Sequence, residues 1–153
     1  MSSIDPPADF VWSDAFLLGF PPMDATHREF VDCVNAMLTA RDEDVAARMD
    51  EFADHAQRHF DEERGWMTST EFPASQCHID EHEAVLKSLR EVRERLATTG
   101  DVAMARSLAK ELARWFPGHA DYMDASLSHW MSKLRYGGKP MVLRRNILED
   151  RNA

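Results

Sequence analysis

The sequence predicts an all-α protein, folded as an antiparallel up-down four-helix bundle, and three observations support this prediction. Four stretches carry apolar residues in alternating steps of four and three, which is the spacing of a helix face buried against other helices. Short connections join the four stretches and favour antiparallel neighbours. No stretch shows the alternation of apolar and polar residues that marks a strand, and no unit repeats at a fixed period.

The composition excludes several classes of protein. The 153 residues suffice for one domain with a core, and the hydrophobic fraction of 44% is ordinary for a soluble globular protein. A net charge of −9, with no basic block before the tail, argues against nucleic acid and anionic membranes as partners. No apolar run approaches the roughly 20 residues of a membrane span. The start lacks a signal-peptide pattern, and Cys33 and Cys77 form no CxxC pair, so we expect reduced thiols in a cytoplasmic protein.

The first half of the chain is expected to form an arm and two helices. Residues 1–22 contain four prolines among residues that need burial, which predicts an irregular N-terminal arm packed on the bundle. Asp24 is a suitable N-cap for a first helix that ends near Ala40. A second helix is expected from about Asp44 to Thr68, before a break at Pro73.

The second half is expected to form two more helices and a tail. The third helix runs from about Ser75 to Ala97, and the fourth from about Asp101 to Leu134, with Tyr122 on its core stripe. Pro117 and Gly118 interrupt the fourth helix and predict a kink or a widened turn there. The predicted division is therefore an arm over 1–22, a bundle over 23–136 and a C-terminal tail over 137–153.

Histidines lie on the core face of all four predicted helices. A single core histidine is usually a hydrogen-bonded structural residue, but five on converging faces would each need a separate buried partner. A shared metal would satisfy them together. The spacing of His78 and His82 is a moderately specific metal-binding pattern. The five core histidines are His27, His59, His78, His82 and His119.

Two carboxylates complete this set and indicate the class of metal. Glu63 is four residues after His59 and shares its helix face. Asp124 is five residues after His119, roughly 140° around an ideal helix, so it reaches the same site only if the helix is distorted or the centre is wide. Seven ligands exceed the four of a zinc ion and fit two octahedral ions of the iron class. The absence of cysteine from these faces argues against an iron–sulfur cluster.

The motifs resemble the hemerythrin family, in particular its stand-alone bacterial members. The likeness covers about residues 10–130 and includes Trp12-Ser13-Asp14 and Leu18-Gly19 in the arm. Four segments carry it: Met23-Asp24-Ala25-Thr26-His27, His59-Phe60-Asp61-Glu62-Glu63, His78-Ile79-Asp80-Glu81-His82, and Trp115 through His119 to Asp124.

The resemblance implies two non-haem irons with a bridging oxo or hydroxo group. His78, His82 and His119 would hold one iron, and His27 and His59 the other. Glu63 and Asp124 would bridge them. One coordination position would stay open on the second iron. The expected function is then reversible binding of dioxygen, for carriage, storage or local delivery, and not enzymatic turnover.

Two other functions of the same centre stay open. One is turnover of peroxide or nitric oxide by a di-iron enzyme. The other is an oxygen or redox sensor that a partner protein reads. Besides dioxygen, an oxygen-consuming or redox protein is therefore a possible partner.

Some positions depart from the family pattern or compete with it. Trp115, Phe116 and Ala120 are expected to wall the dioxygen pocket. The family usually has small aliphatic residues and an unbroken helix where this chain has Trp115, Phe116 and Pro117, and a bulkier aliphatic residue at the position of Ala120. His55 stands four residues before His59 and is a weaker candidate ligand, expected to lie outside the site. Cys77, beside His78, is read as a small packed residue in preference to a redox-active thiol.

Overall fold

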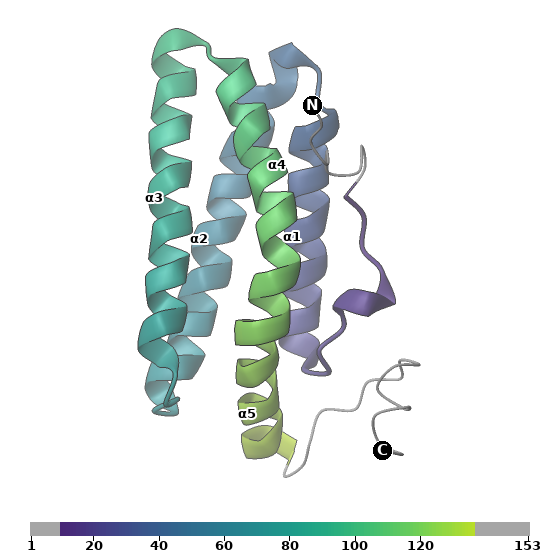
Figure 1. Ribbon diagram of the computed structural model, residues 1–153, viewed down its shortest axis with the longest axis vertical. Helices are drawn as coiled ribbons and strands as arrows, with labels where there is room; N and C mark the ends of the chain where they lie inside the picture. Colours follow the sequence, from purple (N-terminus) through teal and green to yellow (C-terminus); the bar gives the residue numbers. More distant parts are fainter. Residues whose placement is uncertain (1–9, 137–153) are drawn as a thin grey trace.

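The computed structural model describes residues 10–136 and shows the expected antiparallel four-helix bundle (Figure 1). Within this range no strand is present. The long helices are α1 (Pro21–Thr39), α2 (Val45–Ser69), α3 (Ser75–Thr99) and α4 (Val102–His119), which continues through the π-helical turn η3 (Ala120–Asp124) into α5 (Ala125–Tyr136). Two short 3-10 turns precede α1 and α2, namely η1 (Asp14–Phe16) and η2 (Asp42–Asp44). The predicted fold class is confirmed.

Each helix of the bundle packs against its two neighbours. α1 contacts α2 and α4, and α3 contacts the same two helices from the other side. Gly100 ends α3 in the left-handed conformation, at φ 71°, and Asp101 caps α4 by accepting a hydrogen bond from the Met104 amide at 3.0 Å. No helix among residues 10–136 is both long and apolar enough to cross a membrane.

The start of α1 differs from the prediction. The helix begins at Pro21, with Phe20 as N-cap, because two prolines are well suited to a first helical turn. Asp24 is therefore not the N-cap. Its carboxylate accepts hydrogen bonds from the Leu18 amide at 2.8 Å and the Gly19 amide at 3.0 Å, and so ties the preceding segment to the helix. The buried Ser128 hydroxyl donates to the Leu18 carbonyl at 3.1 Å and ties the same segment to α5.

The division into an arm, a bundle and a tail stays a prediction. Residues 1–9 and the whole predicted tail over 137–153 lie outside the described residues.

The buried core forms two apolar clusters, one toward each end of the bundle. The first includes Phe30, Phe52 and Phe116, and the second includes Phe20, Met67 and Leu127. Buried polar side chains lie between the two clusters. On α1, His27 stands between Met23 of the second cluster and Phe30 of the first, and on α2, Glu63 stands between Phe60 of the first and Met67 of the second.

The distortion in the fourth helix lies one turn later than predicted. α4 continues through Pro117 and Gly118, and the widened turn is η3. A π turn closes its hydrogen bonds from residue i to i+5, so residues five apart stand above one another. Asp124 consequently lies one turn below His119 and is buried, while Tyr122, expected on the core stripe, is 84% exposed. The expectation for Tyr122 was wrong because it assumed a regular α-helix.

Replacing Asp24 by alanine should lower the free energy of unfolding by about 1–3 kcal/mol, because two backbone amides lose a charged acceptor. Asp24→Asn should lose less, since its amide oxygen still accepts a hydrogen bond. Urea denaturation measures the effect, with the exposed Asp32→Ala on the same helix as control. Equal urea midpoints for Asp24→Ala and Asp32→Ala would show that the hydrogen bonds from Leu18 and Gly19 to Asp24 do not stabilise the fold.

Candidate metal centre

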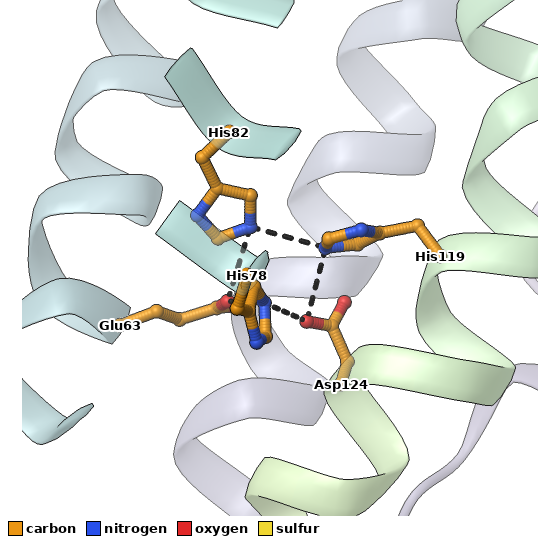
Figure 2. A group of neighbouring side chains, drawn as sticks. All are labelled: Glu63, His78, His82, His119 and Asp124. Carbon is orange, nitrogen blue, oxygen red and sulfur yellow. Dashed lines mark hydrogen bonds and ion pairs between the residues drawn. The ribbon is translucent and has the colours of Figure 1, made fainter. Parts of the chain in front are cut away.

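Seven buried polar side chains meet in the layer between the two apolar clusters. They come from all four helices of the bundle, with α4, η3 and α5 counted as one continuous helix, and none is more than 5% exposed. Figure 2 shows Glu63 from α2, His78 and His82 from α3, and His119 and Asp124 from α4 and η3. The seven residues are His27 from α1, His59 and Glu63 from α2, His78 and His82 from α3, His119 from α4 and Asp124 from η3.

The seven side chains form two sets of possible metal ligands. One set contains Glu63, His78, His82, His119 and Asp124, and the other contains His27, His59 and Glu63; in each, one donor atom per residue lies within 4.8 Å of all the others. The resemblance to the hemerythrin family implies the same division of the histidines into three and two.

Each oxygen of Glu63 faces a different set of histidines. Oε2 lies 2.6 Å from His59 Nε2 and 3.6 Å from His27 Nε2. Oε1 lies 3.3 Å from His78 Nε2 and 3.5 Å from His82 Nε2. The carboxylate therefore stands between the two sets.

The two carboxylate oxygens of Asp124 also face different sets of histidines. Its Oδ2 lies 3.0 Å from His27 Nε2, while Oδ1 lies 2.9 Å from His78 Nε2 and 3.2 Å from His119 Nε2 (Figure 2). Neighbouring ligands of an octahedral ion, at about 2.1 Å from it, are about 3 Å apart, so these separations suit donors that share ions. Both carboxylates have the placement of a bridge.

Hydrogen bonds within the protein leave several buried polar atoms of this layer without a partner. Seven buried nitrogen and oxygen atoms of these side chains make no hydrogen bond within the protein, although such atoms are normally paired. The set mixes imidazole nitrogens with hard carboxylate oxygens and contains no thiolate, which suits ions of the iron class. These observations fit a pair of bound metal ions. The seven atoms are His27 Nδ1 and Nε2, His59 Nδ1, Glu63 Oε1, His78 Nδ1 and Nε2, and Asp124 Oδ1.

The charges in this layer compensate one another. Burial alone would raise the pKa of each carboxyl, and Asp124 raises that of Glu63 further, but the neighbouring imidazoles hold both pKa values well below their usual range. Burial alone would lower the pKa of His27 and of His78, yet Asp124 and Glu63 raise the first to about 10 and the second to about 9. Without metal, the carboxylates of Glu63 and Asp124 therefore favour the protonated forms of His27 and His78.

His82 behaves differently. Burial lowers its pKa to about 3, with His78 and His119 adding to the effect and Glu63 opposing it. Its ring stacks on Phe60, with centroids 3.8 Å apart. His82 is thus a neutral imidazole, the form that binds a metal.

The residues expected to wall the pocket contact different parts of the layer. Phe116 is buried edge-on against His27, with centroids 5.2 Å apart at 86°, and it stacks on Phe30. Ala120 is buried as well. Trp115 instead stacks on His119, with centroids 4.3 Å apart.

Two residues outside the proposed ligand set have clear positions. His55 is buried beside His59 but belongs to neither ligand set; its Nδ1 lies 3.6 Å from Glu29 Oε1. Burial, followed by His59 and Arg58, lowers its pKa to about 4. Cys77 is exposed, so the reading of it as a packed residue was wrong: it lies next to His78 but on the outer face of α3.

Glu81 was not predicted from the sequence as a residue of the site. Its Oε1 lies 2.8 Å from His119 Nδ1 and 3.0 Å from Trp115 Nε1. Glu81 is not on the α3 seam, so core periodicity gives no sign of it. The only signal was its place between His78 and His82, on the flank of α3 that faces α4.

The metal-free protein should lose stability as the pH rises through about 9 to 10. The imidazoles of His27 and His78 have folded-state pKa values above the 6.5 of the unfolded chain, so the stability they contribute is fully present below about pH 6.5 and is lost as they deprotonate. Urea midpoints at about pH 7 and about pH 10.5 measure this loss. The metal-loaded protein is the control, because its ligand imidazoles are already deprotonated at neutral pH. An unchanged midpoint for the metal-free protein would contradict the charge balance described above.

Comparisons with known proteins indicate the family to which the chain belongs. Residues 19–130 match the model of the family described as hemerythrin HHE cation binding domain. The chain is 41% identical over 122 residues to a bacteriohemerythrin of Ralstonia nicotianae, covering 80% of this chain and 88% of that protein. It is 29% identical over 136 residues to one from Pseudomonas paraeruginosa, covering 83% and 87%, and 26% identical over 140 residues to one from Stenotrophomonas maltophilia, covering 84% and 90%. With most of its length matched by the family model, and with two ligand sets meeting in the layer between its apolar clusters, the chain belongs to the hemerythrin family.

Proposed function

We propose that this protein binds dioxygen reversibly at a non-haem di-iron centre, in the cytoplasm, for carriage, storage or local delivery. One observation carries the proposal: Glu63 and Asp124 each present one oxygen toward His27 and the other toward His78. A carboxylate whose two oxygens face two different ligand sets is suited to bridge two neighbouring metal ions. A protein with one metal ion would not need both carboxylates in this position.

The proposed roles follow from the two ligand sets. His78, His82 and His119, with one oxygen from each carboxylate, would give the first iron five protein ligands. His27 and His59, with the two remaining oxygens, would give the second iron four. A shared oxo or hydroxo group would fill one more position on each and leave the second iron one position short of octahedral. When bound, such a centre supplies two electrons and an open position for dioxygen.

The side chains around His27 and His59 favour binding over turnover. Phe116 covers His27, and the Phe30 ring lies 6.1 Å from that of His59, so rings surround the side where the open position would lie. Water that reaches a bound oxygen species promotes its loss, and an apolar surrounding excludes it. Turnover of peroxide or nitric oxide, or sensing for a partner protein, would use the same ligands. These functions are our alternative hypothesis.

The purified protein should contain two irons per chain, one for each ligand set. Anaerobic reduction followed by exposure to air should produce an oxygenated form that returns to the reduced form when oxygen is removed. Metal analysis, visible spectroscopy and resonance Raman spectroscopy measure these properties. A single zinc per chain, with no iron after expression in iron-supplemented medium, would rule out the proposed centre. Rapid oxidation with turnover would favour the alternative hypothesis of an enzyme or a sensor.

Phe116→Leu should accelerate both the decay of the oxygenated form and the binding of azide to the ferric form, because it opens the apolar cover on His27. Phe52→Leu is the matched control, since Phe52 is equally buried and packs edge-on against the same Phe30. Both variants should lose roughly 1–2 kcal/mol of stability. If the two variants change the two rates equally, Phe116 has no particular role in covering the site.

A further inference from the structure

Glu81 lies at the boundary between solvent and the metal-binding layer. Its Oε1 accepts two hydrogen bonds, from Trp115 Nε1 at 3.0 Å and from His119 Nδ1 at 2.8 Å. The same side chain is 34% exposed and lines a mostly apolar surface groove between α3 and α4. Part of the Glu81 side chain therefore contacts water while one of its oxygens reaches a buried imidazole.

The two nitrogens of the His119 ring face different surroundings, so Glu81 contacts the nitrogen that does not face the ligand set. Its other nitrogen, Nε2, points into the ligand set, 3.0 Å from His82 Nε2 and 3.2 Å from Asp124 Oδ1. A metal bound by Nε2 requires that nitrogen to be unprotonated, so Nδ1 carries the hydrogen of the neutral ring. Glu81 is placed to accept that hydrogen.

His119 is distinguished from three other histidines of the layer by this contact. The Nδ1 atoms of His27, His59 and His78 are buried without a hydrogen-bond partner. The Nδ1 of His119 instead faces a carboxylate, and the Trp115 ring covers the same imidazole at an interplanar angle of 24°. Trp115 thus holds both the acceptor and the ring.

We propose that Glu81 is a positioning residue of the metal centre: through Nδ1 it fixes the tautomer and orientation of His119 and makes that imidazole a stronger donor to its metal. Trp115 assists by keeping Glu81 in place. A carboxylate behind a metal-binding histidine commonly acts in this way, and its loss typically costs about 10–100-fold in metal affinity. The inference rests on the proposed di-iron function, because it assigns His119 to one of the two ions.

Two substitutions separate the charge of Glu81 from its hydrogen bond. Glu81→Gln keeps an acceptor oxygen for His119 and Trp115 but removes the charge. Iron should be retained, while the reduction potential should rise because the neutral amide makes His119 a weaker donor to ferric iron. Glu81→Leu removes the acceptor as well, and iron release to a chelator should be about 10–100-fold faster.

Glu111→Gln is the matched control. Glu111 lines the same groove and bonds to Arg114, so its substitution removes one negative charge from the groove without touching an imidazole. It should leave both the iron release rate and the potential at wild-type values. Circular dichroism of the iron-free variants shows whether the bundle is intact.

The outcomes distinguish this inference from the function on which it rests. Wild-type potential in Glu81→Gln, or wild-type release of iron from a folded Glu81→Leu, would overturn the role of Glu81 while leaving dioxygen binding intact. If Glu81→Leu does not fold, the potential of Glu81→Gln still decides. If the wild-type protein loads iron but forms no oxygenated adduct, the proposed function fails and the comparison of variants still stands.

Discussion

The structure depends on one constraint: two carboxylates lie in the interior of a helical bundle with almost no access to water. Buried carboxylates are strongly destabilising unless opposite charge or hydrogen-bond donors compensate them. Here the compensation comes from imidazoles on all four helices, with His27 and His78 close enough to both Glu63 and Asp124 to hold protons. Each helix must therefore be in register with the others at this layer, and the two apolar clusters hold it there from either side.

The π turn is the local solution that this constraint requires. A regular α-helix would turn Asp124 away from His119 and bring Tyr122 inward. The extra residue in η3 reverses these positions, so that the carboxylate enters the layer and the phenol ring faces solvent. π turns are uncommon and often occur at functional sites, where a single side chain must be redirected without ending the helix.

Much of this arrangement could be predicted from the sequence because it follows helical periodicity. The spacing of four and three placed the core histidines and Glu63 on buried faces, and the five-residue offset of Asp124 indicated a distortion. The location of the distortion could not be predicted, because Pro117 was taken as its cause whereas α4 continues through it. Asp24 and Glu81 were misread or missed for a related reason: both act across elements, one on the chain before α1 and one on α4, and such contacts leave no period in the sequence.

The surroundings of the two ligand sets differ in a way that matters for function. His27 and His59 lie among phenylalanine rings, with no hydrogen-bond partner for either Nδ1. His119, in the other set, is tied through Nδ1 to a carboxylate that contacts solvent. Since a negative charge behind an imidazole strengthens its donation, the ion held by His119 would be the more electron-rich of the two and the more firmly held. The apolar side would then be left to bind the small neutral ligand. The proposed centre has one anchored ion and one open ion, and this asymmetry would come from side chains outside the ligands themselves.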